Sequence, residues 1–517
     1  MNHAALLSFA CGFASLSLEI LWVRLYGFAK ASTPAAFGFV LCTYLLGIAI
    51  GASLGARACR SANSDMQLWR ASVAALLLSA LLSPLLPALY AMASTAGIQN
   101  PLLDVAVIAT ASAVLSFVFP IAHHLGTRNV EHARGRHFAR VYTSNVMGAA
   151  LGPLVTGYVL LETVSLQSSF LIIGLLQVAA AVLLARVVRV RPGAGAMMSA
   201  GALGASCLAT AAFALDPHAL VRHFTPNGQP ARAVVENRHG IVAIFAGSGD
   251  DDMVFGGNVY DGRTNLDPVR NTNGLERPLL LAALHPAPQR VLVAGLSIGT
   301  WLALVREFPG VESIDVVEIN PGYLQAAQSY PAQAAALRDR RVHVVIDDAR
   351  RWLRHHPQRR YDLIIMNTTL HWRANASLLL SRQLLQQMRS HMAPGAVLAF
   401  NATGSPDAFL TAAQVFPHAY RYQNFVYAAE FDFRPRKDSA QARAAYAGLQ
   451  LQGRPLFAPG TPTADGFLAI PFGTIAADQA PVPRRLETVT DENMITEFRY
   501  GRTLYYWTDL FFFSAAP

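Results

Sequence analysis

Cysteine is scarce in this sequence, and its distribution is one-sided. The 517 residues contain four cysteines, all before residue 216: Cys11, Cys42, Cys59 and Cys207. The part of the chain after residue 216 therefore has neither a disulfide framework nor a cysteine-based metal site. The histidine pairs His123/His124 and His355/His356 have no second pair of ligands at metal spacing, so we expect no bound metal.

Charged residues are also few, at 14% of the chain, while hydrophobic residues reach 53%. This balance excludes an ordinary soluble enzyme over the whole length. Nearly all of the excess lies before residue 216, in seven apolar segments long enough to cross a bilayer. They cover approximately residues 4–29, 34–56, 71–93, 102–122, 139–161, 166–186 and 194–215. We expect an α-helical transmembrane domain at 1–215, with the lipid bilayer as its partner. The first segment is not a cleavable signal peptide, because it has no basic start and further spans follow directly.

The formal net charge of +9 would suit a nucleic-acid partner, but much of it has a simpler explanation. Arginines cluster in three of the loops between the predicted spans: Arg57, Arg60 and Arg70; Arg128, Arg134, Arg136 and Arg140; and Arg186, Arg189 and Arg191. The positive-inside rule places these loops in the cytoplasm. We therefore expect no nucleic-acid partner.

The side of the membrane occupied by the rest of the chain is a point of conflict. Seven spans with those loops inside put the N-terminus inside and everything after residue 216 outside, away from the cytoplasmic pool of nucleotide cofactors. If the alanine- and glycine-rich segment 194–215 does not cross, the rest of the chain is cytoplasmic. We favour the cytoplasmic side of a bacterial-type inner membrane and leave the opposite side open.

After residue 216 the pattern changes to that of an α/β protein. We expect a linker at 216–232, a small antiparallel β region at 233–289 and a Rossmann-like domain at 290–517. The domain's strands are predicted at 290–295, 313–318, 342–346, 361–366 and 396–401, and its helices at 299–308, 321–329, 349–355 and 377–392. This alternation predicts a mostly parallel sheet with a ligand at the carboxyl ends of its strands. Residues 453–485, rich in proline and glycine, are expected to form loops.

A glycine-rich turn follows the first of these strands. The sequence VLVAGLSIG at 291–299 offers Gly295, Ser297 and Gly299, whose backbone would approach a ligand closely at the start of a helix. The next strand ends at Glu318, which is followed by Ile319. An acid at that position accepts hydrogen bonds from both ribose hydroxyls in nucleotide-binding folds. The pattern predicts a nucleoside-containing ligand.

Polar residues also follow the third and fourth strands. Asp347, Asp348 and Ala349 end the third strand, where an acid would accept a hydrogen bond from the exocyclic amine of adenine and the neighbouring backbone would read the ring. Asn367 and Thr368 end the fourth strand. All of these residues belong to the edge of the sheet where a parallel fold binds its ligand.

This order of sites resembles the S-adenosylmethionine-binding folds, and specifically the spermidine synthase (aminopropyltransferase) family. Upstream, Asp261-Gly262-x-x-Asn265 and Glu276 keep the spacing of the family's D-G-x-x-Q and later glutamate, with Asn in place of Gln. Further family-like segments are Tyr361-Asp362-Leu-Ile-Ile and Leu380-Ser381-Arg382, and the similarity covers roughly 233–430. The resemblance implies that the substrate is a small molecule, S-adenosylmethionine.

The apolar half adds to the resemblance. Ser17-Leu18-Glu19-x-x-Trp22-x-Arg24 and Gly47-x-x-x-Gly51-x-x-x-Gly55 look like segments of the bacterial integral-membrane spermidine synthase-like proteins. Charged residues inside a bilayer are costly, so Glu19 and Arg24 should pair or face a polar cavity. The glycines have the spacing of a helix-packing surface, and a homodimer through this span is open.

One position departs from the family and changes the expected chemistry. Aminopropyl transfer needs a base, because the attacking amine is protonated at neutral pH. Asn367 stands where spermidine synthases place an aspartate, and an amide is not a base. His371 is an alternative base in the loop that follows.

A reaction without an external base is attack by the donor's own carboxylate, which is ionised at pH 7. Attack on Cγ of S-adenosylmethionine releases 5′-methylthioadenosine and α-amino-γ-butyrolactone, and intramolecular geometry is worth roughly 7 to 11 kcal/mol in favourable cases. Asn367, Thr368 and Tyr260 would orient the amino-acid part, with Asn265 and Glu276 holding its amino group.

This cleavage is the leading hypothesis from sequence. The alternatives are aminopropyl transfer from decarboxylated S-adenosylmethionine, and a transporter or sensor whose α/β half only binds the ligand.

Overall fold

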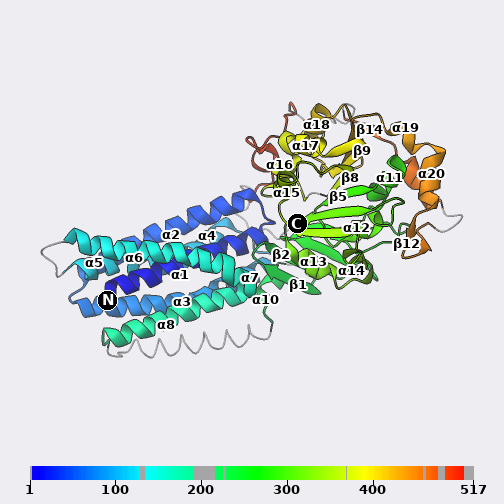
Figure 1. The fold of residues 1–517 in the computed structure, drawn as a ribbon. Helices are drawn as coiled ribbons and strands as arrows, with labels where there is room; N and C mark the ends of the chain where they lie inside the picture. The colour runs from blue at the N-terminus through cyan, green and yellow to red at the C-terminus, as the bar shows by residue number, and fades with distance from the viewer. Residues whose placement is uncertain are drawn as a thin grey trace.

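The computed structural model describes residues 3–128, 134–190, 216–224, 229–367, 369–457, 462–475, 482 and 484–505. A bundle of long helices forms one half of the molecule and an α/β structure the other, and the two meet end to end (Figure 1). The α/β half therefore contacts only one end of the bundle.

The bundle consists of α1 (His3–Ala29), α2 (Pro34–Ser61), α3 (Asp65–Thr95), α4 (Pro101–Ser116), α5 (Val118–Thr127), α6 (Arg134–Val155), a π-helical turn η1 (Thr156–Leu160), α7 (Leu161–Thr163) and α8 (Leu166–Val187). Among the described residues, six helical segments are long and apolar enough to cross a membrane: 3–29, 34–61, 65–95, 101–127, 134–163 and 166–187. They correspond to the first six predicted spans. The seventh, at 194–215, lies outside the described residues.

Small residues allow close helix packing in the bundle. A side-chain carbon on Gly47, Gly51 or Gly55 of α2 would collide with the backbone oxygen of Ala109, Ala113 or Phe117 respectively. These three glycines therefore bring α2 against α4.

A four-stranded antiparallel sheet follows the bundle, in the order β1 (Ala233–Asn237), β2 (Gly240–Phe245), β3 (Met253–Gly256) and β4 (Val259–Arg263). The short helix α10 (Ala219–Arg222) precedes it, and α11 (Glu276–Leu284) connects it to the main sheet. The antiparallel region predicted from sequence is thus confirmed.

The main sheet has eight strands in the order β14-β10-β11-β9-β8-β5-β6-β7. Its parallel part contains β5 (Arg290–Ala294), β6 (Ser313–Glu318), β7 (Val342–Ile346), β8 (Tyr361–Met366) and β9 (Met392–Asn401). The antiparallel part contains β10 (His418–Tyr422), β11 (Phe425–Ala429) and β14 (Gly473–Thr474). A mostly parallel, Rossmann-like sheet after a helical region was predicted, and it is confirmed.

Helices cover both faces of this sheet. Residues alternate along β5, so that Val291 and Val293 pack with α11, α12 (Thr300–Val305) and α14 (Pro331–Leu337). Leu292 and Ala294 point to the other face and pack with α15 (Ala349–His355), α17 (Arg382–Ser390) and α18 (Pro406–Val415). Such a two-sided core is typical of a buried parallel strand. The remaining elements are α13 (Pro321–Ala327), α16 (Ala376–Leu380), α19 (Arg434–Lys437), α20 (Ala440–Ala447), β12 (Gln450–Leu451), β13 (Arg454–Pro455), α21 (Thr463–Ala469) and α22 (Ile495–Phe498).

Two sequence-based boundaries were wrong. The single helix expected at 377–392 is two helices, because Ser381 ends α16 and its hydroxyl caps α17 by accepting a hydrogen bond from the Leu384 amide at 3.2 Å. The strand expected at 396–401 begins earlier, at Met392. Both errors come from local capping and pairing that hydrophobic periodicity does not report.

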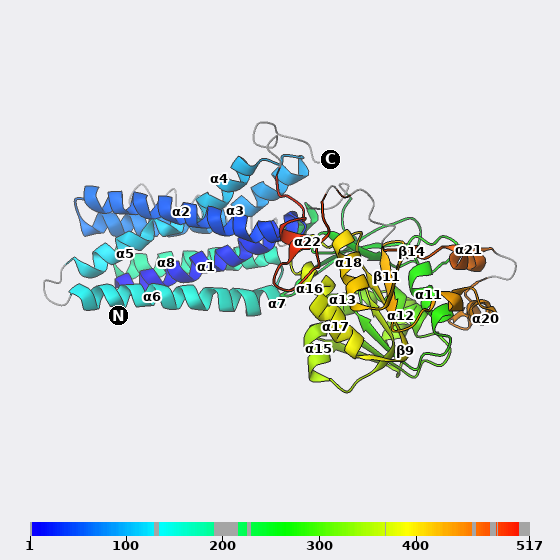
Figure 2. The same cartoon turned by 90° about the horizontal axis from the view of Figure 1, so that it is seen from above.

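The two halves are joined by polar contacts at one end of the bundle. Arg24 of α1 donates hydrogen bonds to the backbone oxygens of Asn237 and Arg238 in the β1–β2 turn, rather than pairing with Glu19. The Ala374 amide donates to the Ser32 oxygen in the α1–α2 loop at 2.9 Å. Figure 2 shows the same end of the bundle against the α/β half from above.

Candidate functional site

A small, partly open pocket lies at the carboxyl end of β5, and we call it the cavity. The glycine-rich turn forms one wall: Gly295 and Gly299 have φ angles of 88° and 81°, and Ser297 has a φ of 50°. The Ser297 hydroxyl donates a hydrogen bond to the Asp261 backbone oxygen at 2.9 Å, which ties the turn to β4. The cavity is lined by Asp261, Gly262, Arg263, Asn273, Val293, Gly295, Leu296, Ser297, Ile298, Thr300, Trp301, Leu302, Ile365 and Asn367.

Glu318 ends β6 beside this turn and is 4% exposed. Its carboxylate accepts hydrogen bonds from the backbone amides of Leu296, at 2.7 Å, and Asn320, at 2.8 Å. Burial raises its pKa to about 7, against the opposing effect of those hydrogen bonds. Ile319 follows and is 57% exposed, so it offers an apolar surface next to a buried acid. This pairing suits a nucleoside, whose sugar is polar and whose base is flat and apolar.

The two acids after β7 have structural partners of their own. The Asp348 carboxylate caps α15 by accepting a hydrogen bond from the Arg351 amide at 2.8 Å, directly before Ala349. Asp347 accepts from the Arg351 side chain at 2.5 Å. Asp348 therefore has a capping role whether or not it also contacts adenine.

The upstream residues lie in two places. Tyr260 is 44% exposed on β4, next to the cavity-lining Asp261. Asn265, in the connection between β4 and α11, and Glu276, the first residue of α11, are both buried. The Asn265 amide donates to the Thr272 hydroxyl at 2.8 Å, and Glu276 accepts from the Asn271 side chain at 2.6 Å. Each of these two side chains therefore has a hydrogen-bond partner among the residues that connect β4 to α11.

Asn367 ends a chain of side-chain hydrogen bonds that starts at Arg277. Arg277 donates to Oδ1 of Asn424 at 3.1 Å, and Asn424 donates to Oδ1 of Asn401 at 2.7 Å. Asn401 then donates to Oδ1 of Asn367 at 3.2 Å. A guanidinium has only donors, and the Thr403 amide also donates to Oδ1 of Asn401 at 2.9 Å, so the direction of the chain is fixed. Asn367 lines the cavity, and its Oδ1 is the acceptor at the end of this chain.

Two further residues, Thr368 and His371, were predicted to act beside Asn367. Thr368 lies outside the described residues. Nδ1 of His371 contacts the Thr403 hydroxyl at 3.0 Å, and burial lowers the pKa of this imidazole. His371 is thus a neutral side chain near physiological pH, held by a residue that also contacts Asn401.

Asp261, Arg263 and Asn273 are among the polar cavity-lining residues that were absent from the predicted site. Burial raises the pKa of Asp261, and its carboxylate is hydrogen-bonded to the Tyr323 side chain. Arg263 pairs with the buried Asp251 at 2.6 Å. Asp261 was visible as the first residue of the D-G-x-x-N segment, whereas nothing in the sequence indicated the other two.

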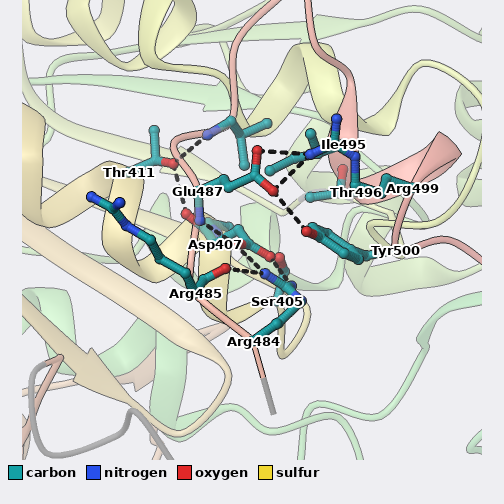
Figure 3. A network of polar contacts seen from close by, with 12 residues as sticks. Ser405, Asp407, Thr411, Arg484, Arg485, Glu487, Ile495, Thr496, Arg499 and Tyr500 are labelled. Atoms are coloured by element: carbon teal, nitrogen blue, oxygen red, sulfur yellow. Dashed lines mark hydrogen bonds and ion pairs between the residues drawn. The ribbon is translucent and has the colours of Figure 1, made fainter. Parts of the chain in front are cut away.

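The C-terminal segment 484–505 forms hydrogen bonds with α18 and with the loop after β8. Asp407 of α18, 1% exposed, pairs with Arg484 and accepts from the Glu487 amide at 2.8 Å (Figure 3). Farther along, Glu497 accepts hydrogen bonds from the backbone amides of Asn375, at 2.8 Å, and Ser377, at 3.0 Å. The loop from Asn367 to α16 is therefore fixed at its far end by a segment distant in sequence.

Part of the chain is similar to a known protein domain. Residues 280–415 match the spermine/spermidine synthase domain. This range begins within α11 and contains the glycine-rich turn, Glu318, Asp348 and Asn367. The part of the chain that contains these residues is thus similar to the spermine/spermidine synthase domain.

Curated relatives have the same kind of name. Polyamine aminopropyltransferase 2 of Streptomyces coelicolor is 29% identical over 292 residues, which is 54% of this chain and 51% of that protein. The polyamine aminopropyltransferase of Mycobacterium tuberculosis is 27% identical over 291 residues, 54% of this chain and 53% of that protein. The chain thus spans about half the length of these relatives. These relatives are named for aminopropyl transfer, which was an alternative predicted from the sequence.

Two solved structures of spermidine synthases are similar to part of this chain. Spermidine synthase in complex with the transition-state analogue AdoDATO gives a TM-score of 0.39 with 17% identity, over 47% of this chain and 87% of that one. Spermidine synthase from Thermotoga maritima gives a TM-score of 0.38 with 16% identity, over 47% and 86%.

Proposed function

We propose that this chain is an aminopropyltransferase-type enzyme that displaces 5′-methylthioadenosine from a sulfonium nucleoside. The observation that carries the proposal is the cavity between Asp261 and the glycine-rich turn. The turn belongs to residues 280–415, which match the spermine/spermidine synthase domain. The donor is decarboxylated S-adenosylmethionine and the acceptor is a primary amine. No metal ion takes part.

Donor binding uses the ends of the parallel strands. The ribose hydroxyls donate to Glu318, the adenine packs on Ile319, and Asp348 accepts from its exocyclic amine. Gly295 and Gly299 support this assignment because positive φ angles let the backbone approach a ligand without side-chain obstruction. The sulfonium end then extends toward Asp261 and Asn367.

Asp261 serves as the base in this proposal. The amine must lose a proton before its lone pair attacks the carbon next to sulfur, and the proton passes to the Asp261 carboxylate and on to solvent. The carbon–sulfur bond breaks with its electron pair moving to sulfur, which neutralises the sulfonium and releases 5′-methylthioadenosine. A carboxyl whose pKa is raised by burial is a stronger base than a solvated one. Asp261 thus fills the role that Asn367 lacks.

A second candidate is cleavage of S-adenosylmethionine itself by its own carboxylate, giving the γ-lactone and 5′-methylthioadenosine. The hydrogen-bond direction at Asn367 favours it, because Oδ1 of Asn367 already accepts from Asn401 and its N–H group suits a carboxylate acceptor and not an ammonium group. Arg263, the cation in the cavity wall, supports the same ligand charge.

The two candidates are separated by incubating purified protein with each donor, with and without putrescine. Aminopropyl transfer predicts an extended amine from the decarboxylated donor only when putrescine is present. Cyclisation predicts lactone from S-adenosylmethionine alone. Neither product from either donor would leave binding without turnover and refute both.

A further inference from the structure

The helix bundle has two chemically different ends. At the end distant from the α/β half are the α2–α3 connection, the end of α5 with the start of α6, and the end of α8 (Figures 1 and 2). Nine arginines lie in or beside these three regions: Arg57, Arg60, Arg70, Arg128, Arg134, Arg136, Arg140, Arg186 and Arg189. We call this the basic end.

The end that contacts the α/β half carries few basic residues. Its connections are residues 30–33, 96–100 and 164–165, and they contain a single basic residue, Lys30. Lys30 is mostly buried and pairs with Asp104 at 3.6 Å. Arg24, one turn and a half before Lys30, is engaged with backbone oxygens of the β1–β2 turn. We call this the docking end.

Contacts from three connections fix the α/β half at the docking end. Glu236 of β1 accepts from the Leu166 amide at the start of α8, at 2.8 Å. Thr95 at the end of α3 contacts Nδ1 of His223 at 2.9 Å. The Ser32 hydroxyl donates to the Gly257 oxygen at 3.2 Å. These contacts involve described residues alone, so the attachment does not depend on the path of the chain between Val190 and Asp216.

We infer that the α/β half and its cavity lie on the non-cytoplasmic face of the membrane. Short loops rich in lysine and arginine stay on the cytoplasmic side, and here they are all at the basic end. The helical spans are each long enough to separate the two ends by a bilayer. From the sequence we favoured the cytoplasmic side, because nucleotide cofactors are cytoplasmic and the crossing at 194–215 was open.

The position of Asp216 agrees with this orientation. The Gln167 side chain, in the first turn of α8, donates to the Asp216 oxygen at 3.0 Å and accepts from the Leu220 amide at 2.8 Å. Asp216 is therefore at the docking end, whereas Val187 ends α8 at the basic end, about 33 Å away for a helix of this length. The seventh crossing predicted at 194–215 lies between these two points, outside the described residues.

This orientation has a consequence for the substrates. A sulfonium nucleoside carries a permanent positive charge and a polar sugar, so it does not cross the hydrocarbon core unaided. A transport step must therefore supply the donor to the face where the cavity lies. The orientation itself does not depend on which reaction takes place.

Cysteine labelling in intact bacterial cells tests the orientation. The four native cysteines are replaced by alanine in the full chain, and one cysteine is introduced at a time. Val269→Cys reports on the α/β half, since Val269 is 66% exposed, and Asn63→Cys is the matched variant in the exposed α2–α3 connection. Both should react with a maleimide after detergent treatment.

Before permeabilisation, a membrane-impermeant maleimide should label Val269→Cys and not Asn63→Cys. Labelling of Asn63→Cys in intact cells, or protection of Val269→Cys there, overturns the inference. An alkaline phosphatase fusion at the C-terminus gives an independent readout, because that enzyme is active only outside the cytoplasm. If the phosphatase fusion is inactive in cells that contain the full-length protein, the α/β half does not lie on the non-cytoplasmic face.

Discussion

The side chain of Asn401 donates a hydrogen bond to Oδ1 of Asn367 across 3.2 Å. Two other donors, the Thr403 amide and the Asn424 side chain, occupy Oδ1 of Asn401 and so fix which end of its amide faces Asn367. The site therefore has its hydrogen-bond polarity set by residues outside the cavity. A substitution at Asn401 that removes only its hydrogen bond to Asn367 tests this relationship.

Asn401→Asp keeps the acceptor needed by Thr403 and Asn424 but loses the donor to Asn367. Asn367 should then turn its nitrogen to the new carboxylate and present its oxygen to the cavity. Binding of S-adenosylmethionine should weaken at least tenfold, while binding of the decarboxylated donor should change less. Calorimetry with both donors checks this, and Asn63→Asp on the exposed α2–α3 connection is the control. Equal loss for the two donors would show that Asn367 does not face the donor's carboxylate.

Glu318 should make nucleoside binding depend on pH. Its pKa is raised to about 7, and only the ionised form accepts hydrogen bonds from both ribose hydroxyls. Below pH 7 the group must lose a proton before binding, so affinity should fall as pH decreases and level off above pH 7 to 8. Titration with 5′-methylthioadenosine from pH 5.5 to 8.5 measures it. A flat profile contradicts a direct contact with the ribose.

Glu318→Ala should lower nucleoside affinity at least tenfold, because each lost charge-assisted hydrogen bond is worth about 1.5 to 3 kcal/mol. The variant also removes the acceptor for the Leu296 and Asn320 amides, so its thermal unfolding must be recorded alongside. Unchanged affinity in a folded variant would restrict Glu318 to a structural role.

Asp348 is expected to recognise adenine in addition to capping α15. Asp348→Asn keeps a capping side chain and removes the charge, so KM should rise while kcat and stability stay the same. Asp348→Ala should lower stability by about 1 kcal/mol as well. Loss of kcat in Asp348→Asn, with binding intact, would assign the residue to proton transfer instead.

Asp261 is the base in aminopropyl transfer, so Asp261→Asn should reduce kcat by about 100-fold or more with little effect on donor affinity. Tyr323→Phe is the matched variant: it removes the hydrogen bond that lowers the pKa of Asp261, so the pH profile of kcat should shift to higher pH. Full activity of Asp261→Asn would eliminate this residue as the base.

The sequence was most informative where one local signal determined one element. The strands at 313–318, 342–346 and 361–366 match β6, β7 and β8 in full, because each is an apolar run followed by polar strand-end residues. The glycine turn and Glu318 were predictable for the same reason. Their ligand contacts, and those of Asn265 and Glu276, are still predictions.

The chain of amides was not predictable, because its members are distant in sequence. Asn401 and Asn424 are in contact because β11 pairs with β9 in an antiparallel register, which places Phe425 opposite Asn401. That pairing follows from the packing of the whole sheet. Likewise, the contact of Ser32 with Ala374 depends on the orientation of the bundle relative to the sheet. Such contacts carry no sequence motif.

The most direct test of the account is mass spectrometry of the purified full-length protein incubated with decarboxylated S-adenosylmethionine and putrescine. We predict equal amounts of 5′-methylthioadenosine and aminopropylated putrescine, both lost in Asp261→Asn. Lactone and 5′-methylthioadenosine from S-adenosylmethionine alone, with no product from the decarboxylated donor, would replace transfer by cyclisation. Absence of 5′-methylthioadenosine with either donor, from protein that binds the nucleoside, would contradict the proposed enzymatic function.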